Sequence, residues 1–156
     1  MRRPILLVAV LAVWGVAAGG AFSSVHRTAE QSADSDRARP TLIARGSEYG
    51  RVLFDGRGFV LYGFTRDPRD RSVCAGACAT AWPPYLLRGR LQAGAGARQS
   101  LLGTTQRSNG SLQVTYAGRP LYYYEGDRSP GQILCQNVRE FGGLWLVVRP
   151  SGALVR

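Results

Sequence analysis

A pattern of ten residues occurs twice in this chain, sixty positions apart. Residues 58–67 read GFVLYGFTRD and residues 118–127 read GRPLYYYEGD, so both follow the pattern Gly-x-x-Leu-Tyr-x-aromatic-x-x-Asp. Trp82 and Trp145 extend the match, because each follows a cysteine-bearing loop and precedes an apolar run. A chain of 156 residues has room for one compact domain plus short extensions. We therefore expect one domain made of two related units, neither of which buries its apolar face alone.

Turn chemistry divides most of the chain into short strands, and helical periodicity is nearly absent. Apolar runs end at glycine-rich or Asn-Gly turns, where glycine tolerates a positive φ angle. The pattern predicts hairpins within residues 52–62, 101–124 and 144–155. We expect an all-β fold in which two tandem hairpin-based repeats, residues 50–90 and 111–156, form one small pseudo-twofold sandwich or barrel.

The N-terminal residues have the order of a secretory signal. Arg2 and Arg3 precede an uncharged stretch, residues 4–25, that turns to small residues near its end. The stretch is also about long enough to cross a hydrocarbon core of ~30 Å. We expect residues 1–21 to be a signal peptide or an N-terminal membrane anchor with an apolar helix. Residues 22–41 are then a disordered linker, and residues 42–156 the exported domain, either secreted or anchored to the outer face of the cytoplasmic membrane.

The charge balance indicates the kind of partner. The chain carries 20 basic and 10 acidic residues, a formal net charge of +10, and every basic residue is arginine. The arginines are spread from Arg27 to Arg156, whereas a nucleic-acid site would gather them on one face among aromatic residues. We expect no nucleic-acid partner. We expect an anionic envelope component or an envelope protein instead, with membrane contact through the apolar N-terminal segment if it is not cleaved.

With these motifs, the chain resembles the bacterial secreted-repeat family of predicted lipoproteins, defined by tandem Tyr-x-(Phe/Trp/Tyr)-x-x-Asp motifs. The resemblance covers roughly residues 53–155, and its most specific segments are 61–67, 74–84, 121–127 and 140–148. It implies an exported protein and no particular chemistry, because the family is of unknown function. Lipoprotein members carry a cysteine just after the leader, whereas the first cysteine here is Cys74. Lipidation is therefore not expected.

Cys74 and Cys78 enclose the segment CAGAC. A c-type haem site needs Cys-x-x-Cys-His and a thioredoxin-like centre needs Cys-x-x-Cys, so the spacing disfavours both. Zinc needs four ligands, but the domain supplies three cysteines, and the single histidine, His26, lies in the linker. In an oxidising compartment we expect a disulfide between Cys74 and Cys78. A redox role stays open, because thiol reactivity depends on the surroundings.

The third cysteine, Cys135, lies about one residue out of register with Cys74 in the repeat. It is either a free thiol or an alternative partner for Cys74 or Cys78. A bond between the repeats would close a loop of about 60 residues and contribute on the order of 4 kcal/mol. The sequence leaves both alternatives open, because the pairing depends on geometry.

Six motif residues form the candidate site: Tyr62, Phe64, Asp67, Tyr122, Tyr124 and Asp127. The two aromatic residues of each motif point to the same side of a strand, and the aspartate can cap the turn that follows. This pattern predicts packing and turn formation. The alternative interpretation is a ligand site, in which the rings and carboxylates bind a flat or cationic molecule through stacking and cation–π contacts.

Catalysis has few candidate residues in this domain. Without a histidine there is no Ser-His-Asp or Cys-His pair, and the sequence gives no separation for the carboxylates of Asp67 and Asp127. We expect no catalytic residue, no metal ligand set and no cofactor. The sequence favours an exported cell-envelope protein that acts as a binding or interaction module. The alternatives are a thiol redox or haem/electron-transfer accessory protein, and a carboxylate-based metal binder or hydrolase.

Overall fold

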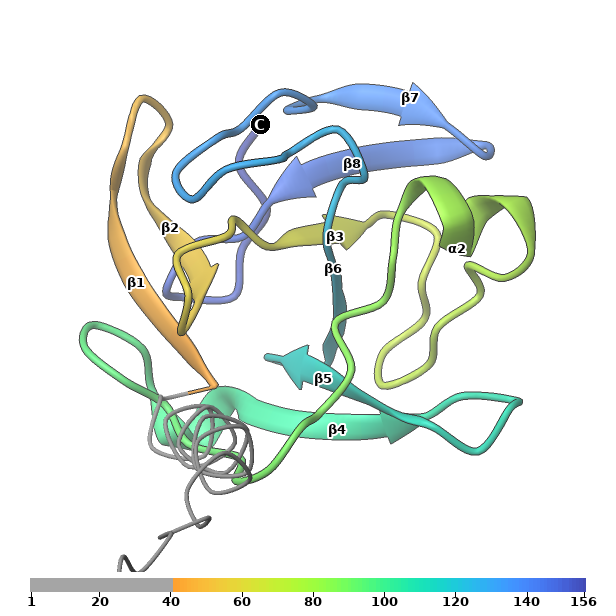
Figure 1. Cartoon of the computed structure of the whole chain (residues 1–156), viewed down its shortest axis with the longest axis horizontal. Coiled ribbons are helices and arrows are strands. Elements are labelled where there is room, and N and C mark those ends of the chain that lie inside the picture. The colour runs from red at the N-terminus through yellow and green to blue at the C-terminus, as the bar shows by residue number, and fades with distance from the viewer. Residues whose placement is uncertain (1–40) are drawn as a thin grey trace, which may run out of the picture.

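A computed structural model describes residues 41–156, and the expected leader, residues 1–21, and nearly all of the expected linker lie outside the described residues (Figure 1). The described part contains two short helices, α2 (Ala77–Ala81) and a 3-10 helix (Gln99–Leu101). Neither is long and apolar enough to cross a membrane. The strands are β1 (Leu42–Ser47), β2 (Gly50–Asp55), β3 (Tyr62–Phe64), β4 (Leu102–Gln106), β5 (Leu112–Tyr116), β6 (Arg119–Tyr122), β7 (Val138–Glu140) and β8 (Gly143–Val147).

The strands form two antiparallel sheets, which confirms the predicted all-β, sandwich-like fold. One sheet is the hairpin β1–β2, and the other has the strand order β4-β5-β6-β3-β8-β7. In Figure 1 the larger sheet twists from β7 and β8 at the top to β4 and β5 at the bottom, and the β1–β2 hairpin closes the left side. The turn between β5 and β6 has positive φ angles at Ala117 (51°) and Gly118 (75°), as a tight hairpin turn requires.

The two repeats meet at their motif tyrosines. Strands β3 and β6 are antiparallel neighbours, and Tyr62 lies directly opposite Tyr122. When a residue pairs in an antiparallel sheet with its own counterpart from the other repeat, a local twofold axis relates the two residues and passes between them. The sixty-residue repeat of the sequence is therefore a pseudo-twofold rotation in the structure, and its axis passes between these two residues.

Each repeat also gives a strand to the other. Tyr62 of the first repeat pairs with Val147 in β8 of the second repeat. Tyr122 of the second repeat pairs with Pro84, which follows Trp82 in the first repeat. Pro84 and Val147 are therefore counterparts. Each motif strand in the central sheet therefore pairs with a segment of the other repeat, so neither repeat contains all the strands that its own motif strand pairs with.

Four aromatic rings taken alternately from the two repeats form the centre of the core. Phe64 stacks on Trp145 with ring centroids 4.1 Å apart, and Trp145 stacks on Trp82 at the same spacing of 4.1 Å. Tyr124 lies against the other face of the column, 4.9 Å from Trp82. Both tryptophans are 0% exposed. This order gives the physical reason for the repeat: each half supplies rings that the other half buries.

Candidate functional site

The motif tyrosines and aspartates form two hydrogen bonds that cross between the repeats. The Tyr62 hydroxyl donates to Oδ2 of Asp127 at 2.8 Å, and the Tyr122 hydroxyl donates to Oδ2 of Asp67 at 2.6 Å. The second oxygen of each aspartate accepts a backbone N–H within its own repeat, from Val73 at 2.8 Å and from Leu134 at 3.0 Å. Each carboxylate therefore closes its own loop and holds the tyrosine of the other repeat.

Burial determines the acid–base behaviour of these four groups. Tyr62 and Tyr122 are 0% exposed, and burial raises the pKa of both hydroxyls, with a further contribution from the aspartates. Burial also raises the pKa of Asp67 and Asp127, although the tyrosine hydrogen bonds act in the opposite direction. The faces of the two tyrosine rings lie inside the core. A ligand role for the six motif residues stays a prediction.

Cys74 and Cys78 form a disulfide with Cα atoms 5.3 Å apart, as the sequence predicts. The bridge is buried, since the two cysteines are 1% and 7% exposed. Cys135 is a half-buried free thiol, which decides between the two alternatives for this residue. It directly follows Leu134, just as Cys74 directly follows Val73, so it is the counterpart of Cys74 without a partner. Burial raises the pKa of its thiol.

Possible metal ligands do not gather in the described part of the chain. Among residues 41–156 no group of three or more histidine, cysteine, aspartate and glutamate side chains lies together. In both Asp67 and Asp127, one carboxylate oxygen accepts the crossed hydrogen bond and the other accepts a backbone N–H. Glu140 is also engaged, because its Oε2 accepts the indole N–H of Trp82 at 2.7 Å.

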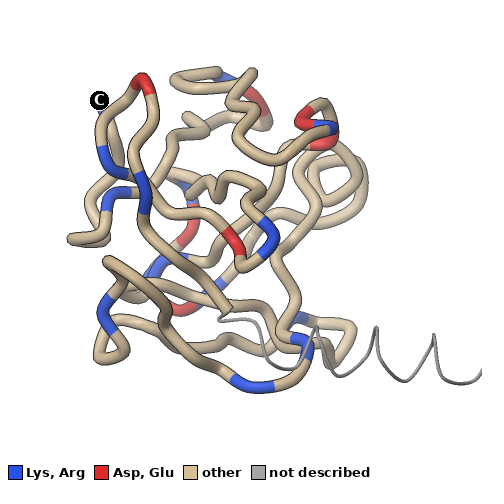
Figure 2. Tube along the Cα trace, turned by 60° about the vertical axis from the view of Figure 1, so that its left-hand side comes forward, with Lys and Arg blue, Asp and Glu red and all other residues tan. Residues whose placement is uncertain are grey.

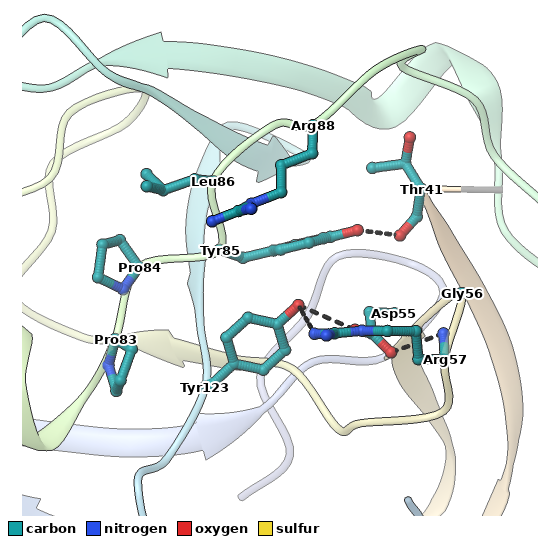
Figure 3. A pocket seen from close by; sticks show the side chains of 10 residues that line it. All are labelled: Thr41, Asp55, Gly56, Arg57, Pro83, Pro84, Tyr85, Leu86, Arg88 and Tyr123. Carbon is teal, nitrogen blue, oxygen red and sulfur yellow. Dashed lines mark hydrogen bonds and ion pairs between the residues drawn. The ribbon is translucent and has the colours of Figure 1, made fainter. Parts of the chain in front are cut away.

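A cleft of about 370 Å³ is lined mainly by residues of the first repeat and by Tyr123 of the second, and by none of the six candidate residues (Figure 3). Its walls come from the turn after β2, from the strand segment after α2 and from the residue after β6. Two tyrosines, Tyr85 and Tyr123, contact each other in it with an edge-to-face geometry, with ring centroids 5.3 Å apart. The hydroxyl of Tyr85 donates to the carbonyl of Thr41 at the rim. The cleft is also lined by Asp55, Arg57, Pro84, Leu86 and Arg88.

The polar side of the cleft is held rigid by Asp55, which is only 2% exposed. Its Oδ2 accepts hydrogen bonds from Nε of Arg57 and from the hydroxyl of Tyr123, both at 2.9 Å. Its Oδ1 accepts the backbone N–H groups of Arg57 and Phe59, also at 2.9 Å. All its acceptor positions are used within the protein. Burial raises the pKa of Tyr123, and the carboxylate of Asp55 raises it further.

Arg88 gives this cleft a net positive charge. It is exposed and makes no hydrogen bond or ion pair within residues 41–156, whereas Arg57 is already paired with Asp55. Figure 3 draws its side chain on the side of Tyr85 that faces away from Tyr123. In the described part of the chain the arginines make only two ion pairs, Arg57 with Asp55 and Arg69 with Asp70. Figure 2 shows the basic positions spread over the whole tube, so the arginines do not gather into one basic face around the cleft.

The cleft residues were not among the sequence candidates. The sequence feature that could have indicated them is a difference between the repeats, because Tyr123 occupies the position that corresponds to Gly63 in the first repeat. In the first repeat an added Cβ at Gly63 would meet Cδ2 of Leu154 at 2.9 Å. The C-terminal segment therefore covers the position that corresponds to Tyr123. A repeat search rewards similarity, whereas the cleft lies where the two repeats differ.

Comparison with known proteins agrees with this architecture. A family model described as a secreted repeat of unknown function matches residues 45–85 and residues 103–149, one match for each repeat. The comparisons with curated proteins and with solved structures gave no match. The two matched segments carry both tyrosine motifs and both core tryptophans, and together they span more than half of the chain. The chain belongs to this family of secreted repeats and is an exported protein.

Proposed function

We infer that this protein is a non-catalytic binding module of the cell envelope, and that the cleft at Tyr85 and Tyr123 is its binding site. The observation that carries this proposal is the combination of two adjacent tyrosine rings with the unpaired guanidinium of Arg88 at one concave surface. Binding sites are commonly concave surfaces lined by aromatic groups with a few fixed polar groups. Asp55 fixes Arg57 and Tyr123 before any ligand arrives, so binding would cost little ordering of side chains.

The charge of the cleft favours an acidic partner. Arg88 supplies a guanidinium without a competing carboxylate. The side chain of Arg57 is 52% exposed, and its Nη1 makes no hydrogen bond among the described residues, whereas its Nη2 donates to the Tyr123 hydroxyl at 3.3 Å. Guanidinium groups bind carboxylates and phosphates through charge-assisted hydrogen bonds. The partner is therefore an anionic envelope component or an acidic segment of an envelope protein.

The alternative functions draw less support from the geometry. A redox protein needs an accessible disulfide, whereas Cys74 and Cys78 are nearly buried. A carboxylate-based enzyme or metal binder needs uncommitted oxygens at one place, whereas Asp67 and Asp127 hold the two repeats together.

Sedimentation of the full chain with isolated cell envelopes tests the proposal. The variant Arg88→Glu changes the cleft, and Arg139→Glu makes the same charge change at an exposed position on β7, the far edge of the sheet. We expect saturable binding that Arg88→Glu weakens on the order of tenfold and Arg139→Glu leaves within twofold. Equal losses in both variants would indicate general charge attraction and would overturn the proposed site.

A further inference from the structure

The strand segment formed by residues 83–87 has one paired side and one open side. Four backbone hydrogen bonds pair the inner side: Tyr123 N to Pro83 O at 2.8 Å, Tyr85 N to Leu121 O at 2.9 Å, Val114 N to Tyr85 O at 2.8 Å, and Leu87 N to Leu112 O at 2.9 Å. Alternate residues of a strand point their backbone groups to opposite sides. Pro84 and Leu86 therefore point theirs outward. The Pro84 carbonyl and both backbone groups of Leu86 make no hydrogen bond within residues 41–156.

The corresponding edge of the second repeat is covered by the C-terminal segment of the chain. Val147 and Arg149 are the twofold counterparts of Pro84 and Leu86. The Val147 carbonyl accepts the N–H of Val155 at 3.0 Å, and the N–H of Arg149 donates to the carbonyl of Ala153 at 2.8 Å. Between these bonds Leu154 lies opposite Val148. The fold thus contains the same strand edge twice, once covered by an added antiparallel strand and once open.

The open edge coincides with the cleft. Pro84, Leu86 and Arg88 lie along one segment and all line it. Unpaired N–H and C=O groups on an edge strand can take up another extended chain. The positive charge of Arg88 at the end of this edge favours a segment that carries a carboxylate.

Tyr123 limits the side chain that fits opposite Tyr85. In the second repeat the corresponding place holds Leu154, which packs against Gly63 because that residue has no side chain. In the first repeat the ring of Tyr123 stands at the counterpart of Gly63. A bound strand therefore needs a small residue, glycine or alanine, at the position that Leu154 takes in the covered edge.

We propose that the edge formed by Pro84–Leu86 binds an acidic peptide segment of an envelope protein as an added antiparallel strand. This inference rests on the proposed function and specifies the ligand of the same cleft. The peptide donates an N–H to the Pro84 carbonyl and accepts the N–H of Leu86. It places a small residue opposite Tyr85 and an acidic residue beside Arg88. The segment 152–155 is the template for this geometry within the chain itself.

A nuclear magnetic resonance titration of the nitrogen-15-labelled full chain tests the proposal. The probe is the end-blocked peptide Asp-Gly-Ala-Ala-Val-Asp, which follows the sequence Gly152–Val155 with alanine in place of leucine. We expect a saturable shift of the Leu86 amide signal and slower hydrogen exchange at that amide. N-methylation of the peptide valine, whose N–H faces the Pro84 carbonyl, should weaken binding about fivefold. Arg88→Glu should weaken it on the order of tenfold, with Arg139→Glu as the matched control.

Two further peptides and one salt complete the experiment. A probe with leucine opposite Tyr85 and a probe with asparagine in place of both aspartates should each bind more weakly, and sodium acetate alone should not shift the Leu86 amide. Equal binding by the N-methylated peptide, or an equal shift from acetate, would overturn strand addition. If envelopes bind in an Arg88-dependent manner while the peptide leaves Leu86 unchanged, the strand proposal fails and the binding site stands. If neither binds, both fail.

Discussion

Replacing Tyr62 by phenylalanine removes one hydroxyl group from the crossed pair of hydrogen bonds that joins the repeats. The hydroxyl donates to Asp127 at 2.8 Å, and both residues are buried, with exposed fractions of 0% and 8%. A hydrogen bond to a charged group contributes about 1.5–3 kcal/mol, and the carboxylate that loses it has little access to water. We expect the free energy of unfolding to fall by about 2 kcal/mol.

The other half of the crossed pair provides a matched comparison. Tyr122→Phe removes the corresponding hydroxyl, but Asp67 is only half-buried, and Ser72, whose Oγ lies 2.7 Å from the lost hydroxyl oxygen, still accepts a hydrogen bond from Arg107. Water can reach Asp67 and replace part of what is lost, so we expect a cost of about 1 kcal/mol. Tyr49→Phe is the control, because the Tyr49 hydroxyl makes no hydrogen bond among the described residues, and it should change stability by less than about 0.5 kcal/mol.

Urea unfolding followed by circular dichroism measures these differences, provided that the slope against urea stays constant. A double-mutant cycle of Tyr62→Phe with Asp127→Asn isolates the pair. We expect a coupling energy of at least about 1 kcal/mol. Additive effects within about 0.5 kcal/mol, or equal costs for Tyr62→Phe and Tyr49→Phe, would refute the reasoning.

Three further changes have expected outcomes. Burial raises the folded-state pKa of Asp67 and Asp127, so the folded protein binds these two protons more tightly than the unfolded chain does. The resulting contribution to stability is lost as pH rises from about 4 through the raised pKa values. In urea unfolding at a series of pH values, the double variant Asp67→Asn with Asp127→Asn should show a smaller loss of stability over this range. Ala117→Gly removes a side chain from a residue with φ of 51° and should raise stability by about 1 kcal/mol in the same assay; a decrease would contradict this. Cys74→Ala with Cys78→Ala opens a loop with a sequence separation of 4 and should cost about 2 kcal/mol of the free energy of unfolding, and an unchanged midpoint would count against the predicted constraint.

Local signals in the sequence were sufficient for the meander of β4, β5 and β6, the duplication and the disulfide, whereas the β1–β2 and β7–β8 hairpins were not predicted. Glycine-rich turns and alternating apolar residues depend on neighbours along the chain, so β5 and β6 and the turn at Ala117 could be predicted directly. The pairing of Cys74 with Cys78 followed from their short separation and the exported location.

Partners across the twofold axis could not be predicted from the sequence. The repeat motif places Tyr62 and Asp67 five residues apart, yet Tyr62 bonds to Asp127 of the other repeat. Which aspartate a tyrosine reaches depends on how the strands are exchanged, and that information is not local. The cleft was missed for a related reason, because it depends on Tyr123 replacing a glycine and on an uncovered edge at Leu86.

The central claim is that each repeat is completed by the other, and dividing the chain between them tests it most directly. Residues 41–98 and residues 99–156 would be prepared separately and then mixed in equimolar amounts. We expect that each fragment alone lacks the near-ultraviolet circular dichroism of packed tryptophans, and that mixing restores it together with a one-to-one complex. A single fragment that shows native dichroism and cooperative unfolding by itself would contradict the account.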